Sequence, residues 1–212
     1  MKQRVFNLII LDESGSMCSI EKQAIDGVNE TVQTIRAAQN KHEDQEHFLT
    51  LVSFNSNSIK TIYDNVETEK VEELTGRQYR PSCRTPLYDA MGDALTRLSK
   101  NVAENDAVLV TVITDGYENA SREYSGKAIK SLVESLKSKG WLFTYIGANQ
   151  DVEAVAASIS ITNTLSFSAD AEGTAAMFAR ERQARNRWTD RLASQIAPSI
   201  MADDYFDDVD DK

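Results

Sequence analysis

The sequence is poor in the residues that cross-link a chain or break it into separate parts. Its 212 residues include two cysteines, Cys18 and Cys83, which are too few for a disulfide framework, and we expect two reduced, partly buried thiols. Three prolines and no low-complexity stretch leave no evident linker between domains. No run approaches the roughly 20 apolar residues that a membrane-spanning helix needs. Because 41% of the residues are hydrophobic, one domain with its own core is the simplest organisation.

Histidine and positive charge are also scarce. His42 and His47 are the only histidines, so no familiar Ser-His-Asp arrangement is expected. His42 lies in a polar stretch and His47 begins a predicted strand, and we expect both on the surface. The 33 acidic residues outnumber the 23 basic ones and give a net charge of −10. This balance argues against a nucleic acid partner, because its phosphates require a basic surface.

The two ends of the sequence differ in character. Residues 1–12 place basic residues before an apolar run that is too short for a signal peptide, ends in an acid and lacks a small-residue cleavage site. We interpret the run as a core strand and expect a cytoplasmic protein. Residues 203–212 carry six Asp and one Lys, which is half of the net charge. We therefore predict a single domain at residues 1–200 and a disordered acidic tail at 201–212.

Short apolar runs predict the strands. Residues 5–11, 107–113 and 141–146 are apolar without alternation, which is typical of strands covered on both faces in a parallel sheet. Residues 48–54 form a fourth run, and the turn-forming sequence Asn-Ser-Asn connects it to residues 58–63. This pair predicts an antiparallel hairpin. A weaker last strand is expected within residues 159–167.

Apolar residues recur every three or four positions between these runs, which is the spacing of amphipathic helices. We predict helices at residues 20–35, 87–102, 128–136 and 152–158, and a last helix at 171–196 that Asp170 caps. Strands that alternate with helices predict an α/β fold: a three-layer, doubly wound, Rossmann-like sheet, mostly parallel with one antiparallel edge strand. Its core is expected to span about residues 4–167.

Oxygen-bearing side chains follow the predicted strands. Asp12 ends the first strand, and Ser14 and Ser16 follow it at alternate positions. Asp115 follows the strand at 107–113, and Thr85 stands just before a helix. Ligands of a doubly wound sheet bind beyond the carboxyl ends of the strands, so we expect these side chains at one rim. Two carboxylates and three hydroxyls suit a hard cation such as Mg²⁺ better than zinc.

This pattern resembles a known family. The motif D-x-S-x-S at Asp12, Ser14 and Ser16, then Thr85, then an Asp-Gly pair at Asp115, is similar to the metal-ion-dependent adhesion site (MIDAS) of von Willebrand factor type A (vWA) domains. The flanking sequences L-D-E-S-G-S-M, T-P-L-Y-D-A and I-T-D-G-Y-E-N resemble those of bacterial intracellular members. The resemblance covers about residues 4–167.

The resemblance implies a role for each residue. Ser14, Ser16 and Thr85 would bind Mg²⁺ directly, or alternatively Mn²⁺ or Ca²⁺, and Asp12 and Asp115 would bind it more indirectly, often through water. One coordination position would remain for a Glu or Asp of a partner protein. The chain would then be a protein-binding module and not an enzyme, without a membrane or nucleic acid partner. Small bacterial members often work in ATPase-associated complexes, and self-association stays open.

Two other functions stay open. A Mg²⁺-dependent hydrolase or phosphatase could use Asp12 as its nucleophile, although that chemistry usually has a second acid where Ser14 stands. Alternatively, the domain could be a scaffold or oligomerisation unit with a purely structural metal. Cys18 and Cys83 lie two residues from the predicted ligands Ser16 and Thr85, so a redox-sensitive pair is a further hypothesis.

The predicted last helix is rich in arginine. We interpret these residues as a solvated basic face, with Trp188 packed on the sheet. Alternatively, the acidic tail folds onto this face or reaches the metal of a neighbouring molecule. The arginines are Arg180, Arg182, Arg185, Arg187 and Arg191.

Overall fold

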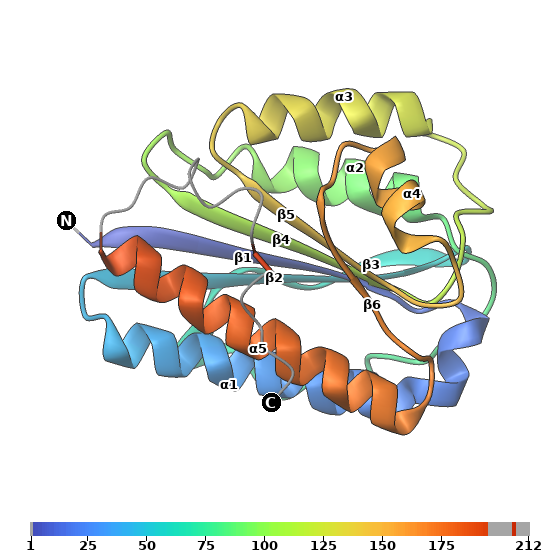
Figure 1. Cartoon of the computed structure of the whole chain (residues 1–212), viewed down its shortest axis with the longest axis horizontal. Helices are drawn as coiled ribbons and strands as arrows, with labels where there is room; N and C mark the ends of the chain where they lie inside the picture. The colour runs from blue at the N-terminus through green and yellow to red at the C-terminus, as the bar shows by residue number, and fades with distance from the viewer. Residues whose placement is uncertain (1, 195–204, 207–212) are drawn as a thin grey trace.

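A computed structural model describes residues 2–194 and 205–206, and it shows one six-stranded sheet between two layers of helices (Figure 1). The strand order is β3-β2-β1-β4-β5-β6. The strands are β1 (Gln3–Asp12), β2 (Gln45–Asn55), β3 (Ser58–Glu67), β4 (Ala107–Thr114), β5 (Leu142–Gly147) and β6 (Asn163–Ser166). The helices are α1 (Glu21–Lys41), α2 (Leu87–Leu98), α3 (Gly126–Lys137), α4 (Val152–Ser158) and α5 (Ala171–Ala193), with short 3-10 helices η1 (Gly15–Ile20) and η2 (Thr68–Lys70).

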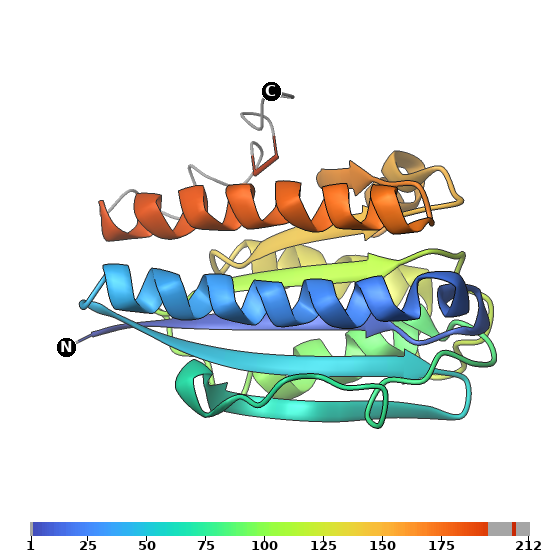
Figure 2. The ribbon, with the colours of Figure 1, turned by 90° about the horizontal axis from the view of Figure 1, so that it is seen from below.

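The continuous apolar runs are explained by helices on both faces of the sheet. Alternate residues of β1 enter two separate hydrophobic clusters: Ile9 faces the layer of α1 and α5, whereas Leu8 and Ile10 face the layer of α2, α3 and α4. Figure 2 shows α1 and α5 side by side along one face of the sheet. Their close approach requires Gly27, because a Cβ there would lie 2.0 Å from a ring carbon of Phe178.

The winding of the chain defines a crevice. β1 pairs in parallel with both β2 and β4, and the chain reaches β2 and β3 on one side before it crosses to β4, β5 and β6 on the other. The carboxyl ends of β1 and β4 therefore flank the point where the strand order reverses, which is where doubly wound sheets bind ligands. β3 is the antiparallel strand and lies at one edge, paired with β2.

The fold class predicted from the sequence is confirmed. Five observed strands match the five stronger predicted runs, with boundaries that differ by a few residues at most. The largest difference is in the 58–63 run, which extends to Glu67. The weak strand at 159–167 is shorter than predicted, because Ile159 caps α4 and only Asn163–Ser166 pair with β5. Asp170 caps α5 as expected: its side chain accepts a hydrogen bond from the Gly173 N–H at 2.8 Å. None of the helices in residues 2–194 combines the length and hydropathy of a membrane span.

His47 is not the surface residue that the sequence suggested, because its side chain is fully buried near the amino end of β2. Asn7 Nδ2 lies 3.4 Å from His47 Nδ1, and His47 Nε2 lies 2.9 Å from Gln45 Oε1. These partners indicate a neutral ring that carries its proton on Nε2. Burial, reinforced by the charges of Arg185 and His42, lowers the pKa of His47 to about 3.

The buried His47 predicts a loss of stability in acid. The unfolded chain binds a proton on this ring below its ordinary pKa of 6.5, whereas the folded chain does not until about 3. Stability should therefore fall as the pH drops through this window, by about 2 kcal/mol at about pH 5. We expect His47→Gln to remove about that much of the difference in unfolding free energy between about pH 7.5 and about pH 5, measured in urea. His42→Gln is the control, and equal pH dependence in wild type and His47→Gln would contradict the prediction.

The predicted basic face of α5 is wrong at one position. Arg185 is 1% exposed and its guanidinium points onto the sheet, where it donates to Asn7 Oδ1 at 2.7 Å and to Thr111 Oγ1 at 3.0 Å. Its charge is paired with Glu181, which is equally buried, at 2.6 Å. Trp188 packs into the core as predicted. The interface of α5 with β1 and β4 is therefore partly polar.

Part of the predicted tail lies against the same helix. Tyr205 and Phe206 are buried and in edge-to-face contact, so they differ from the expected disorder, while residues 201–204 and 207–212 lie outside the described residues. The Tyr205 N–H donates to Asn163 Oδ1 at 3.2 Å, and Arg187 donates to the Tyr205 carbonyl at 3.1 Å. These contacts join Tyr205 to α5 and to the edge strand β6. The domain boundary at residue 200 stays a prediction.

Candidate metal centre

The candidate metal centre lies at the carboxyl ends of β1 and β4. Asp12 is the last residue of β1 and is fully buried. Its two oxygens are both engaged: Oδ1 accepts the Ser14 N–H at 2.7 Å, and Oδ2 accepts the Thr114 hydroxyl at 2.6 Å. Asp12 thereby joins the end of β4 to the first turn after β1. This carboxylate is held in place before any ligand arrives.

The five predicted residues are brought together at this rim. Ser14 Oγ and Ser16 Oγ lie 3.2 Å apart, and Ser16 Oγ donates to Asp115 Oδ1 at 2.5 Å. A Cβ placed on Gly116 would lie 3.6 Å from Ser16 Oγ and 3.9 Å from Thr85 Oγ1, so the threonine hydroxyl is a close neighbour of this group. Four of the five side chains belong to buried residues, and only Ser16 belongs to an exposed one. The oxygens thus gather from three separate segments and open to solvent at Ser16.

The charges of this group are uncompensated by the rest of the described protein. Burial raises the pKa of Asp12 to about 6, against the hydrogen bonds from Thr114 and Ser14 that lower it, and the nearby Asp115 charge raises it further. Burial also raises the pKa of Asp115, which the hydrogen bond from Ser16 opposes. Among residues 2–194 and 205–206, no Lys, Arg or His forms an ion pair with either carboxylate. A bound cation would relieve both effects.

The donor set fits a hard divalent cation. Thr85 is 3% exposed, yet its hydroxyl has no hydrogen-bond partner among the described residues, so the oxygen is free to coordinate. The side-chain oxygen of Ser14 lies 3.2 Å from that of Ser16, within the same group. In the described part of the chain, no three His, Cys, Asp or Glu side chains form a group that could hold a metal. An ion here must rely on hydroxyls as well as carboxylates, a preference of Mg²⁺, Mn²⁺ and Ca²⁺ rather than zinc.

Glu13 stabilises the loops around the centre from the side of β2 and β3, and it was not predicted from the sequence. It is 1% exposed and points away from Asp12, toward β2 and β3. Its carboxylate accepts hydrogen bonds from Lys60 Nζ at 2.6 Å, the Arg80 N–H at 2.6 Å and Ser53 Oγ at 2.8 Å. The Glu13 carbonyl also accepts the Ser82 N–H, so this residue holds the loop before Thr85 against the sheet. Strand alternation could have placed Glu13 opposite Asp12, but its partners could not be foreseen.

Thr85 is positioned by the loop after β4. Its N–H donates to Asn119 Oδ1 at 3.0 Å, and its carbonyl accepts the Asn119 N–H at 3.1 Å. Glu118 in turn accepts the Tyr88 N–H at 3.0 Å, which ties the same loop to the first turn of α2. Asn119 and Glu118 were also missed from the sequence. The polar sequence Y-E-N after Asp115 was a signal for them, because short polar side chains commonly bridge loops to helix starts.

The two cysteines flank the centre but are more exposed than predicted. Both are free thiols on exposed residues. Cys18 Sγ donates to the Pro81 carbonyl at 3.3 Å, and Asn57 Nδ2 donates to Cys83 Sγ at 3.1 Å. Cys83 has a φ of +67°, a left-handed conformation that costs energy in a residue other than glycine. The hypothesis of a redox-sensitive pair stays untested.

Comparison with known proteins identifies the family. The model of the von Willebrand factor type A domain matches residues 8–180, and the chain belongs to this family. Domains of the family commonly mediate protein–protein interactions and bind a divalent metal. Among curated proteins, none matches this sequence closely enough to count as a relative.

Several solved structures share the fold. The PilB minor pilin from Streptococcus sanguinis is 14% identical with a TM-score of 0.61, and the match covers 90% of this chain and 62% of PilB. The SpRpn10 VWA domain is 10% identical with a TM-score of 0.56 and coverages of 85% and 95%. The manganese-loaded TRAP protein of Plasmodium vivax is 16% identical with a TM-score of 0.53 and coverages of 82% and 72%. This chain thus spans less than two thirds of PilB, and the likenesses show the fold alone.

Proposed function

We propose that this chain is a divalent-metal-dependent protein-binding module. Asp12, Ser14, Ser16, Thr85 and Asp115 would hold Mg²⁺, and the bound ion would supply a positive centre to which an acidic side chain of a partner protein can coordinate. The convergence of three hydroxyls and two carboxylates without a cationic partner at one rim carries the proposal. A cytoplasmic location, an ATPase-associated partner and self-association are the finer parts of this proposal.

The residues of the chain have distinct tasks in this function. Thr85 and Ser14 would offer neutral oxygens, which leave more of the charge of the ion for the incoming carboxylate than anionic ligands would. Asp12 fixes the turn after β1 through its hydrogen bond from the Ser14 N–H. Ser16 is the exposed member of the group, so the partner would approach from its side.

The geometry gives less support to hydrolysis. A nucleophilic Asp12 would have to present an oxygen to the substrate, whereas both of its oxygens accept hydrogen bonds inside the protein and the residue is fully buried. The position two residues later is Ser14, which cannot protonate a leaving group as a second acid would. The binding module is therefore the function that the site supports best.

The proposal is tested by affinity capture from native lysate on immobilised protein. A genuine partner should bind in Mg²⁺, be released by EDTA and fail to bind to Thr85→Ala. The variant should keep the circular dichroism spectrum of the wild type. Capture that is equal in Mg²⁺ and EDTA would instead favour the scaffold with a purely structural metal.

A further inference from the structure

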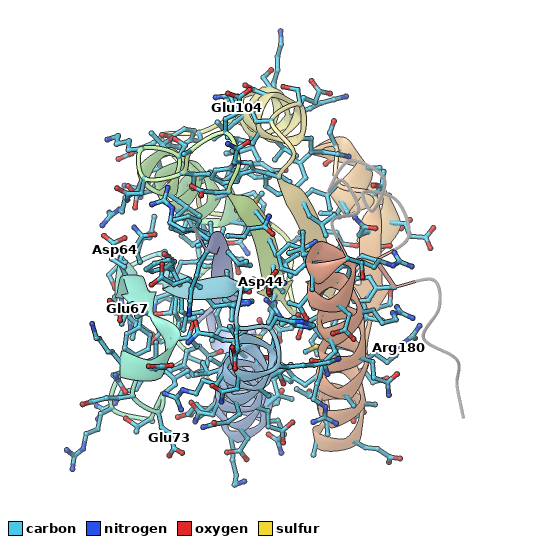
Figure 3. All side chains as sticks on the ribbon, turned by 90° about the vertical axis from the view of Figure 1, so that its left-hand side faces the viewer. Asp44, Asp64, Glu67, Glu73, Glu104 and Arg180 are labelled. Atoms are coloured by element: carbon cyan, nitrogen blue, oxygen red, sulfur yellow. The ribbon has the colours of Figure 1, made fainter. Side chains whose placement is uncertain are left out.

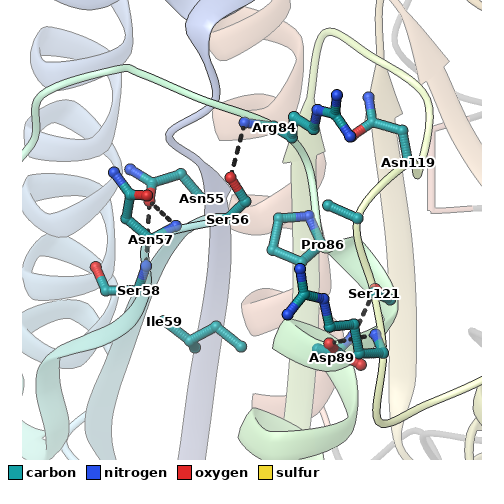
Figure 4. Close-up of a pocket in the computed structure, with 12 residues that line it drawn as sticks. Asn55, Ser56, Asn57, Ser58, Ile59, Arg84, Pro86, Asp89, Asn119 and Ser121 are labelled. Atoms are coloured by element: carbon teal, nitrogen blue, oxygen red, sulfur yellow. Dashed lines mark hydrogen bonds between the residues drawn. The ribbon is translucent and has the colours of Figure 1, made fainter.

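A polar cavity of about 640 Å³ opens beside the candidate metal centre (Figure 4). Three segments line it: the turn between β2 and β3, the residues on either side of Thr85, and the loop after β4. Thr85 itself connects the two sites, because it lies between Arg84 and Pro86 in the chain and pairs with Asn119 on the other wall. A ligand bound at the metal centre would therefore also lie beside this cavity.

Two arginines without ion-pair partners line the cavity. Arg84 and Arg122 are exposed, and neither guanidinium forms a hydrogen bond or ion pair with any residue in the described part of the chain. Their backbones, in contrast, are fixed: the Arg84 N–H donates to Ser56 Oγ at 3.2 Å, and the Arg122 N–H donates to Asp89 Oδ2 at 2.8 Å. Figure 4 shows the Arg84 side chain extended toward Asn119. Two guanidiniums are thus presented on anchored loops.

The acid in the cavity wall does not pair with these cations. Asp89 is the only carboxylate among the lining residues, and its oxygens accept the backbone N–H groups of Arg122, Glu123 and Tyr124 at 2.8 to 2.9 Å. Asp89 thereby fixes the loop after β4. The start of α2 is also satisfied, because Ser121 and Glu118 accept its first N–H groups. The arginine side chains are therefore the charged groups of the cavity that can bind a ligand.

The two guanidiniums belong to a chain of negative net charge. The net charge of the chain is −10, and Figure 3 shows acidic side chains such as Asp44, Asp64 and Glu104 interspersed with basic ones such as Arg180. At the rim, two unpaired guanidiniums would lie next to a bound divalent ion. These guanidiniums would attract an acidic ligand to this part of the rim.

We propose that the cavity binds a second carboxylate of an acidic peptide whose first carboxylate coordinates the metal. This inference rests on the proposed function and adds the chemistry of the partner: a segment in which two Glu or Asp residues lie close together in sequence. In an extended peptide, side chains two residues apart lie on the same side and about 6.6 Å apart. One carboxylate would lie at Thr85, and the other would pair with Arg84, which precedes Thr85 in the chain, or with Arg122, which lines the same cavity. Planar guanidiniums bind carboxylates through paired hydrogen bonds.

The test uses defined peptides and the full chain. One Gly/Ser peptide carries a single glutamate, and a second peptide carries two glutamates two residues apart. Binding is followed by the ¹⁵N amide shifts of the protein, in Mg²⁺ and in EDTA. In Mg²⁺ we expect the second peptide to bind roughly 5- to 20-fold more tightly, the gain expected for two solvent-exposed ion pairs, and the gain should shrink at high salt.

A double variant isolates the cavity from the metal. Arg84→Gln with Arg122→Gln should abolish the preference for the second peptide and leave the weaker binding of the first unchanged. Lys100→Gln with Lys139→Gln is the charge-matched control, because both lysines are exposed and follow the carboxyl ends of α2 and α3 at the far end of the molecule. This control should keep the preference.

The outcomes separate this inference from the function on which it rests. Equal affinity for the two peptides in the wild type, or a preference that survives in the double arginine variant, would overturn the role of the cavity and leave metal capture intact. Failure of both peptides to bind in Mg²⁺ would overturn the proposed function and this inference with it. A preference that is equally strong in EDTA would show that the arginines act without the metal, which also contradicts the two-point mode.

Discussion

Thr85→Ala should lower the affinity for Mg²⁺ by more than roughly 100-fold and leave the fold intact. Loss of groups that merely orient a ligand already costs about 10- to 100-fold in metal affinity, and Thr85 is proposed as a ligand itself. Stability should change little, because the Thr85 hydroxyl has no hydrogen-bond partner among the described residues and its backbone pairing with Asn119 survives in alanine. Calorimetric titration with Mg²⁺ and urea unfolding measure the two quantities.

The combination of effects identifies a binding residue. Thr96→Ala is a suitable control, since Thr96 is exposed on α2 and lies outside the centre. It should leave both the metal affinity and the stability unchanged. Asp115→Asn should also weaken Mg²⁺ binding, because it removes one of two buried negative charges while the shape of the side chain is kept. Unchanged metal affinity in Thr85→Ala would contradict the predicted ligand set.

The layers of the fold could be predicted from the sequence because the central strands are covered on both faces. A strand such as β4 is apolar at most positions, since Ala107–Thr114 is buried throughout. The candidate ligands could be predicted as well, since Asp12 and Asp115 each follow such a strand directly and parallel strands end at the same rim. Periodicity and the order of elements suffice to predict where a residue lies when its position within its own strand or helix determines its surroundings.

Contacts between polar residues that are far apart in the sequence could not be predicted in this way. Arg185 donates a hydrogen bond to Asn7, which is 178 residues away in the sequence. Lys60 of β3 pairs with Glu13, which follows β1. The burial of Arg185 and Glu13 depends on these contacts, because an isolated charge would be too costly to bury. Helical spacing marked Arg185 as one of several surface arginines, and only the packing of α5 on the sheet distinguishes it from Arg182, which stays exposed.

The pair of Arg185 and Glu181 predicts the largest changes in stability. Both side chains are 1% exposed, and Arg185 holds Glu181 through two contacts to the same oxygen, at 2.8 and 2.6 Å. The other oxygen of Glu181 has no partner among the described residues. Removing one member leaves the other as an unpaired buried charge, so Glu181→Leu should lower the free energy of unfolding by about 3–5 kcal/mol. Arg185→Met should cost a similar amount and also leaves Asn7 Oδ1 without its donor.

The double variant distinguishes a costly pair from a stabilising one. Glu181→Leu with Arg185→Met removes both charges and restores apolar volume, so we expect it to be more stable than Arg185→Met alone, although Asn7 Oδ1 lacks its donor in both. The exposed pair of Arg182 and Glu30, 3.2 Å apart, is the control on the same helix, and Arg182→Met should cost less than about 1 kcal/mol. Urea unfolding of these variants gives the coupling energy. Additive losses in the double variant would contradict the view that each charge is buried only because the other compensates it, and would mean that α5 depends on each side chain separately.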